Sequence, residues 1–202
     1  MLFVAGMKYR YIFLIIFLLI LCIPIVYGVL LNDTQKQRIL VFLDPTLDPL
    51  GSGYNAIQSK LAVGSGMVFG TGILKGTQTQ YGYLPIKSSD FIFSVLSEEM
   101  GFVISTAIII LFTFLIIRIL TISNNLSDIY GKYITAGIAG LFFYHFVQNV
   151  GMTFGALPIT GVPLPFVSYG GSNLLTNYFA IGLILNLTAR KEKNILFYKM
   201  IV

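Results

Sequence analysis

The sequence predicts an all-α polytopic membrane protein, and three observations support that fold class. Of the 202 residues, 56% are hydrophobic and only 10% are charged, whereas soluble domains carry roughly 25% charged residues. Mean hydropathy is correspondingly high, at +0.84. The apolar residues gather into runs of about 20, long enough for a helix to cross a hydrocarbon core roughly 30 Å thick. This composition excludes a soluble globular domain, a disordered chain and a coiled coil.

Four apolar segments are predicted to span the membrane, within a single membrane domain of residues 1–202. They cover residues 11–31, 91–120, 133–154 and 173–189. The first segment is too long for a signal-peptide core and lacks a small-residue cleavage site. Two long connections, 32–89 and 155–172, then lie on the side of the membrane opposite the termini.

Basic residues predict which side faces the cytoplasm. Eight of the thirteen flank the spans on the side of the two termini: Lys8, Arg10, Arg118, Lys132, Arg190, Lys191, Lys193 and Lys199. Cytoplasmic flanks are enriched in Lys and Arg, so we expect both termini to be cytoplasmic and both long connections to be extracytoplasmic. The formal net charge of +5 is therefore a topology signal, and nucleic acid is not an expected partner.

The connection 32–89 is longer than connections usually are unless they carry function, and it is dense in glycine. Between Tyr54 and Leu74, apolar residues recur among Gln, Ser, Lys and Gly. That mixture is too polar for a further span and favours a short interfacial or re-entrant helix.

Three acids follow this connection. Asp90 lies where the second span begins, beside Lys87, and two interpretations of it stay open: a helix N-cap, or a general base or charge partner at the membrane boundary. Glu98 and Glu99 follow about 12 to 14 Å deeper along a helix that rises about 1.5 Å per residue. Acids at such depth usually face a bundle interior or a polar cavity. A functional role and a structural ion pair both remain open for them.

The third predicted span carries one polar stripe. His145, Gln148 and Asn149 are spaced i, i+3 and i+4 and therefore share one helix face. Interhelical hydrogen bonding is favoured over a proton relay or a metal site, because a lone histidine provides no ligand cluster. No metal site is predicted, and the glycine-rich stretches match no nucleotide-binding fingerprint.

An ordered set of motifs resembles the shape, elongation, division and sporulation (SEDS) family. The motifs are Gly51–Lys60, Gly64–Gly66, Gly76–Gln78, Leu84–Pro85, Asp90–Phe93, Glu98–Glu99 and Gly161–Ser172. Lysine after Gln58-Ser59, together with Gly76-Thr-Gln78, resembles the RodA branch more than FtsW. One departure is Ile86, where relatives usually have Glu after Leu-Pro. The resemblance implies the C-terminal part of a ten-helix fold, of which these four spans would be the last four.

The resemblance also implies a function. Members of the family are peptidoglycan glycosyltransferases of the bacterial cytoplasmic membrane that polymerise lipid II, an undecaprenyl-pyrophosphate-linked disaccharide peptide. They support cell-wall elongation and rod shape, with a class B penicillin-binding protein and the elongation machinery as partners. The acid that the family is proposed to use in catalysis corresponds to Asp90. Other candidate residues lie in the matched motifs or next to them: Gln58, Lys60, Gln78 and Lys87 for substrate binding, and Glu98, Glu99 and Ser168 in support.

The chemistry of that reaction suits these residues. An acceptor hydroxyl must lose a proton, which a carboxylate at the membrane boundary can accept. The departing pyrophosphate needs cations, and residues 32–89 hold five basic against three acidic residues, a net charge of +2. Lys60 is the first candidate for a phosphate contact, with a lipid headgroup contact as the alternative. The cofactor is unknown; a divalent cation is an option, although no metal-ligand cluster is visible in the sequence.

Two other functions are weighed against the glycosyltransferase. A flippase for lipid-linked precursors would also use polar stripes and membrane-buried acids. A non-catalytic membrane scaffold for a penicillin-binding protein would need only the helices. The cationic outer connection favours the enzyme over the flippase.

Overall fold

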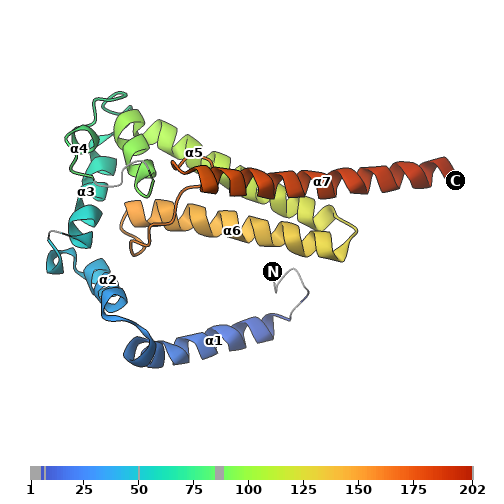
Figure 1. The fold of residues 1–202 in the computed structure, drawn as a ribbon, viewed down its shortest axis with the longest axis horizontal. Coiled ribbons are helices and arrows are strands. Elements are labelled where there is room, and N and C mark those ends of the chain that lie inside the picture. Colours follow the sequence, from blue (N-terminus) through green and yellow to red (C-terminus); the bar gives the residue numbers. More distant parts are fainter. Residues whose placement is uncertain (1–5, 7, 50, 85–88, 202) are drawn as a thin grey trace.

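The computed structural model describes residues 6, 8–49, 51–84 and 89–201, and their regular structure is helical throughout (Figure 1). The elements are α1 (Tyr9–Ile25), the π-helical turn η1 (Val26–Leu30), α2 (Asp33–Leu43), the 3₁₀ turn η2 (Pro45–Leu47), α3 (Ser52–Ser65), α4 (Thr77–Gln80), α5 (Ile92–Asn125), α6 (Ile129–Thr153) and α7 (Gly171–Ile201). Of residues 190–201, only the helical backbone is described.

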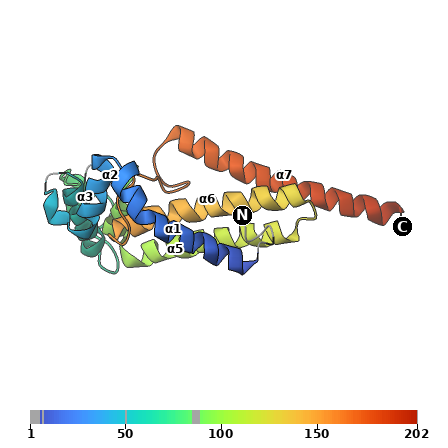
Figure 2. The ribbon, with the colours of Figure 1, turned by 90° about the horizontal axis from the view of Figure 1, so that it is seen from below.

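Helices α5, α6 and α7 run alongside one another, and α2, α3 and α4 gather at the end of this bundle where α5 begins (Figures 1 and 2). Helix α1 stands away from the bundle, and its large side chains are exposed: Phe13 is 70% and Phe17 67% accessible. Such exposure of apolar side chains suits a helix surrounded by lipid or by other helices.

Apolar contacts hold the three bundle helices together. One cluster joins α5, α6 and α7 through Ile116, Ile119, Ala139, Phe142 and Ile184. A second joins α5 to the irregular segment 155–170 through Phe93, Phe112 and Leu164. The second cluster anchors the segment that follows α6 against the start of α5, where the candidate site lies.

Two helices of the described chain are long and apolar enough to cross a membrane, namely Tyr9–Gly28 and Ile92–Asn125. They correspond to the predicted spans 11–31 and 91–120. Helices α6 and α7 occupy the predicted spans 133–154 and 173–189, but the count of four spans stays a prediction.

The observed helices differ from the predicted spans at their ends. Helix α5 continues to Asn125, α6 begins at Ile129 and α7 reaches Ile201. The predicted ends follow hydrophobicity, whereas a helix continues as long as its backbone hydrogen bonds do, and Ser, Thr, Lys and Glu allow that beyond the apolar stretch.

The connection 32–89 is not an open loop, because it contains α2, α3 and α4. The helix expected over residues 54–74 ends at Ser65, and glycine-rich turns follow it. Between α2 and α3, the hydroxyl and the backbone N–H of Thr46 donate to Asp44 Oδ1 at 2.6 and 3.0 Å. These two bonds hold the pKa of the Asp44 carboxyl below its usual value.

Helix α5 is interrupted at Gly101, whose φ of 76° and ψ of −173° fall in a region that is essentially restricted to glycine. The segment 67–72 packs into the break. Four backbone hydrogen bonds join them: Thr71 N–H to Glu98 O (2.9 Å), Gly72 N–H to Glu99 O (3.0 Å), Phe102 N–H to Met67 O (2.8 Å) and Val103 N–H to Val68 O (3.3 Å). At the break, the carbonyls of Glu98 and Glu99 and the N–H groups of Phe102 and Val103 therefore pair with the connection 32–89 instead of within α5.

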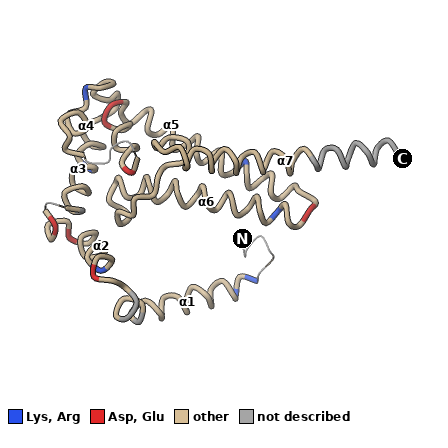
Figure 3. Tube along the Cα trace, in the orientation of Figure 1, with Lys and Arg blue, Asp and Glu red and all other residues tan. Residues whose placement is uncertain are grey.

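Among the residues whose side chains are described, the acids gather at the α2–α4 end of the bundle, except for Asp128 in the turn between α5 and α6 (Figure 3). The long middle stretches of the bundle helices are almost free of charge. Most of the described acidic residues are thus at the end where the two long connections meet.

Candidate active site

Asp90 lies at the junction of α5, α6 and the segment 155–170, and the backbone on both sides of it is held. Asn149 of α6, fully buried, donates from Nδ2 to Asp90 O and to Val162 O, both at 2.8 Å. Ser168 donates from Oγ to Ser89 O at 2.7 Å and accepts from Leu164 N–H at 2.7 Å. Two side chains from different elements therefore fix the position of Asp90.

The Asp90 carboxylate itself is half-buried. Its Oδ1 accepts a hydrogen bond from Ser89 Oγ at 2.7 Å. Its Oδ2 faces Gly161, where a Cβ atom would lie 3.0 Å away. The N-cap of α5 is Phe91, and no side chain caps that helix. The N-cap interpretation of Asp90 is therefore wrong: the chain turns once more before the helix starts, which leaves the carboxylate beside the segment 155–170.

Glu98 lies in different surroundings. It is completely buried, and its two oxygens accept from Gln78 N–H at 2.8 Å, Thr79 N–H at 3.0 Å and Thr77 Oγ at 3.4 Å. These donors are the first residues of α4, whose N–H groups have no partner within the helix. Glu98 thus caps α4 from another helix and faces protein, not lipid.

Glycine lets α4 approach Glu98 this closely. A Cβ at Gly76 would lie 2.7 Å from the Glu98 carboxylate. Glu99, the other acid of the pair, is only partly buried, and Gln80 Nε2 donates to it at 3.3 Å. The two neighbouring acids both contact α4, but only Glu98 is enclosed by it.

The remaining predicted substrate-binding residues divide into three cases. The side-chain oxygens of Gln58 and Gln78 are buried and have no hydrogen-bond partner in the part of the chain that the structure describes. Lys60 is exposed on α3. Lys87 lies outside the described residues, as does Ile86, where the sequence departs from the family pattern.

Ser59, between Gln58 and Lys60, was not among the predicted site residues. Its buried hydroxyl lies 2.7 Å from Ser94 Oγ of α5 and donates to Thr153 O of α6 at 3.0 Å. One small side chain therefore joins α3 to both helices that carry the Asp90 junction. The available signal was a small polar residue among apolar ones on a helix, which is typical of close helix packing in membranes.

The polar stripe of α6 holds the segment that follows the helix. Gln148 Nε2 donates to Pro158 O at 2.9 Å, and Asn149 binds Val162 O as described above. Both residues are hydrogen-bonded, but to the irregular segment after α6 and to the residue before the N-cap of α5, so the expected bonds between helices are not what the structure has. His145 Nδ1 is buried without a partner among the described residues. Within those residues, no three His, Cys, Asp or Glu side chains converge as a metal site would require.

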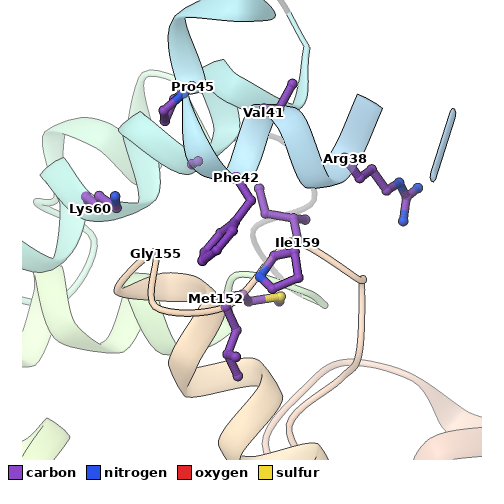
Figure 4. Close-up of a pocket in the computed structure, with 11 residues that line it drawn as sticks. Arg38, Val41, Phe42, Pro45, Lys60, Met152, Gly155 and Ile159 are labelled. Carbon is purple, nitrogen blue, oxygen red and sulfur yellow. The ribbon is translucent and has the colours of Figure 1, made fainter. Parts of the chain in front are cut away.

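A small groove lies between α2, α3, the end of α6 and the start of the segment 155–170 (Figure 4). Its apolar lining includes Val41, Phe42, Pro45, Ala56, Met152, Leu157, Pro158 and Ile159. Two cations, Arg38 and Lys60, also border it. The Lys60 stem lies against Gly155, where any Cβ would collide with its Cε. An apolar groove bordered by cations can take an amphipathic anion.

A sequence profile of the cell cycle protein family FtsW/RodA/SpoVE matches residues 1–193. The chain belongs to this family. Among its relatives are the peptidoglycan glycosyltransferase RodA of Treponema pallidum (strain Nichols), 48% identical over 161 residues, and the peptidoglycan glycosyltransferase MrdB of Escherichia coli (strain K12), 41% identical over 191 residues. The stage V sporulation protein E of Bacillus subtilis (strain 168) is 39% identical over 189 residues.

These matches cover 80%, 95% and 93% of this chain, but only 37%, 52% and 50% of the three relatives. The chain therefore spans about half the length of the curated FtsW/RodA/SpoVE relatives it matches. A solved structure of a peptidoglycan synthase complex that coordinates polymerization and crosslinking is also similar, with a TM-score of 0.74 and 29% identity. That match covers 94% of this chain and 52% of the solved one.

The motifs that resemble the SEDS family in the sequence are brought together only in part. Asp90 and Ser168 meet at one junction, while Gln78, Glu98 and Glu99 meet at α4. Lys60 borders the groove instead. The segment 155–161 connects the groove with Asp90, because its first residues line the groove and Gly161 lies against the carboxylate.

Proposed function

We propose that this chain carries the extracytoplasmic catalytic side of a peptidoglycan glycosyltransferase that polymerises lipid II. The observation that carries the proposal is Asp90, a half-exposed carboxylate whose backbone is held on both sides by Asn149 and Ser168. A fixed carboxylate with an accessible oxygen suits a general base, which must meet its proton at hydrogen-bond distance.

In the proposed reaction, Asp90 accepts the proton of the acceptor sugar hydroxyl. The hydroxyl oxygen forms a bond to the anomeric carbon of the second sugar, and the bond from that carbon to the polyprenyl pyrophosphate breaks. The pyrophosphate leaves with the electron pair. Because negative charge grows on it as it leaves, a nearby lysine or arginine stabilises the transition state.

The groove beside α3 is the proposed site for the lipid-linked end of the substrate. Its apolar wall of Phe42 and Ile159 suits the polyprenyl chain, and Arg38 and Lys60 suit the pyrophosphate. Gln58 and Gln78 are proposed to accept hydrogen bonds from the substrate, since each has a buried side-chain oxygen without a partner among the described residues.

The proposal includes an orientation and partners. Both termini face the cytoplasm in the bacterial cytoplasmic membrane, and a class B penicillin-binding protein supplies crosslinking. The resemblance to a synthase complex that couples polymerization and crosslinking supports such a partner. A flippase or a scaffold is not favoured, because the relatives RodA and MrdB are named glycosyltransferases.

The orientation has its own test. After Cys22 is replaced by serine, a single cysteine introduced at Ser127, which is exposed in the turn between α5 and α6, should resist an impermeant thiol reagent in intact cells. A cysteine at Tyr83 should react. Labelling of position 127 without labelling of position 83 would reverse the proposed orientation.

The catalytic proposal is tested with Asp90→Asn in a chimera in which E. coli MrdB supplies the part of its length that this chain does not span. We expect the chimera to polymerise purified lipid II, and Asp90→Asn to slow polymerisation about 10²- to 10⁴-fold, as loss of a general base does. Asp128→Asn is the matched control, because Asp128 caps α6 at the opposite end of the bundle and asparagine also caps helices.

Near-normal polymer from Asp90→Asn would remove Asp90 from catalysis. An equal loss in both variants would indicate damage to the fold instead of the chemistry, and would equally contradict the proposal. Size-exclusion chromatography in detergent reports the folding of each variant.

A further inference from the structure

The segment 67–74, between α3 and α4, exposes several large apolar side chains. Five large apolar side chains lie at least half exposed: Met67 (80%), Val68 (51%), Phe69 (85%), Ile73 (67%) and Leu74 (72%). Met67 and Leu74 adopt φ values of 44° and 61°, a left-handed conformation that is uncommon for residues other than glycine. The segment thus holds its apolar side chains outward in a defined, unusual backbone conformation.

The part of this segment that lies beside the α5 break is hydrogen-bonded to the protein. Gly70 N–H donates to Gly66 O at 2.7 Å. Thr71 and Gly72 donate to carbonyls of α5, and Met67 and Val68 accept from N–H groups of α5, as described above. Non-helical backbone at membrane depth is tolerated only where its polar groups are paired within the protein or face water. The bonded groups of residues 67–72 meet that condition through the protein. The backbone groups of Phe69, Ile73 and Leu74 have no hydrogen bond within the described chain, so they meet it only by facing interfacial water while their apolar side chains face the acyl chains.

The hydrogen bonds to α5 also set its depth. The stretch of α5 from Phe102 to Ile117 holds no charged residue. Sixteen residues at about 1.5 Å each span about 24 Å, which is less than the roughly 30 Å of a hydrocarbon core. The break at Gly101 therefore lies at one edge of the hydrocarbon, and the segment bonded to it lies at the same level.

Next to the segment, the outer turn of the α5 stretch is also apolar and exposed, at Phe102 (66%), Val103 (49%) and Ile104 (42%). Since Phe102 and Val103 are hydrogen-bonded to the segment, the two exposed surfaces are continuous. Lys75 follows at the end of the segment and is exposed, where an ammonium group can reach lipid phosphates.

We propose that residues 67–74 form a membrane anchor, inserted at the boundary between headgroups and acyl chains of the leaflet next to the α5 break. This anchor fixes the level of α4, and with it Gln78, relative to the membrane. The inference rests on α5 crossing the bilayer and does not depend on the proposed glycosyltransferase activity.

Tryptophan fluorescence tests the anchor directly, because the chain contains no tryptophan. The variants Phe69→Trp, Phe102→Trp and Leu47→Trp each carry one reporter, and the whole chain is reconstituted in vesicles of phosphatidylcholine and phosphatidylglycerol. Phe102→Trp is the control within the span. Leu47→Trp is the control in water, because Leu47 is 59% exposed and lies between Asp44 and Asp48.

We expect Phe69→Trp to lose as much fluorescence to brominated lipids as Phe102→Trp, most strongly with bromine near the headgroup end of the acyl chain. Aqueous iodide should quench Leu47→Trp and spare Phe69→Trp. Leu74→Trp repeats the measurement independently if Phe69→Trp fails to fold, as judged by circular dichroism. Iodide quenching of position 69 or 74 equal to that of position 47 would overturn the proposal and assign the surface to water or to a protein partner.

Discussion

Asp90 and Glu98 are two acids of the same short stretch of chain, and the structure uses them in opposite ways. Around Asp90, the protein's hydrogen bonds hold the backbone and leave one carboxylate oxygen facing a glycine. Around Glu98, they go to the carboxylate, which binds the N-terminus of α4. A carboxylate oxygen without a hydrogen-bond donor can accept a proton from a substrate. A carboxylate whose two oxygens both accept hydrogen bonds from the protein stabilises the fold instead.

This comparison separates two kinds of mutational effect. Changes around Asp90 should reduce activity more than stability, and changes around Glu98 should reduce stability first. Four substitutions test it, in order of decreasing expected effect on the free energy of unfolding.

Gly101→Ala should have the largest effect, about 3 kcal/mol or more, because alanine rarely adopts the backbone conformation found at this position. Its Cβ would also collide with the backbone of Phe69 and Gly70. Thermal unfolding in detergent, followed by circular dichroism, measures the loss. Gly140→Ala is the matched control, since Gly140 lies within α6 with open space around its Cα. Equal melting of the two variants would show that segment 67–72 does not occupy the break.

Glu98→Gln should destabilise the protein by about 1–3 kcal/mol, the cost of a buried donor or acceptor left without a partner. The new amide would present an NH₂ group to an N–H of α4, so one hydrogen bond becomes a contact between two donors. Glu99→Gln, next to it and only partly buried, is the control and should melt like the unchanged chain. The assignment of Glu98 to the fold fails if Glu98→Gln melts normally and only activity is lost.

Asn149→Ala removes two hydrogen bonds, those to Asp90 O and Val162 O. At about 0.5–1.5 kcal/mol for each bond, the loss of stability should be about 1–3 kcal/mol. Polymerisation should fall further than that loss explains, because the backbone that carries Asp90 is released. Gln148→Ala, one residue earlier on α6, loses its single bond to Pro158 and should retain more activity. Activity that follows stability alone in both variants would contradict a positioning role for Asn149.

Ser59→Ala should have the smallest effect, about 1 kcal/mol, since it loses its bond to Thr153 O and leaves Ser94 free to rotate to another acceptor. Ser65→Ala is a control on the same helix, where the hydroxyl binds only the preceding turn. A loss above about 3 kcal/mol at Ser59 would indicate that its contact joins the three helices more tightly than one hydrogen bond allows.

The sequence was sufficient for an all-helical fold, because long apolar runs are local information. It also singled out Asp90 as a candidate through a linear motif, and the catalytic role of that residue stays a prediction. The role of Glu98 was not predictable in that way. Glu98 is buried because N–H groups about twenty residues earlier in the chain donate to its carboxylate. Those groups belong to a helix of only four residues, Thr77–Gln80, which is too short to show a helical pattern in the sequence. Hydrophobicity alone places an acid in an apolar run but says nothing about which backbone groups meet it.

The break in α5 was hidden for a related reason. Glycine occurs often in membrane helices without interrupting them, so Gly101 carried no distinct signal. The N-cap interpretation of Asp90 failed because the Ser-Ser-Asp pattern marks a helix start only to within one or two residues. Ser59 was overlooked because a serine in a motif is noticed for its chemistry, and here its value lies in its small size and its two bonds.

The filled break at Gly101 also has a consequence for membrane insertion. Two carbonyls and two N–H groups of α5 pair only with residues 67–72, so a newly inserted α5 would expose them near lipid until that segment arrives. The segment precedes the break by about thirty residues, a short loop to close, and has therefore left the ribosome before the broken part of α5 does. During translation, residues 67–72 are therefore synthesised before the α5 groups with which they pair. A circular permutation that placed residues 67–72 after α5 would reverse that order.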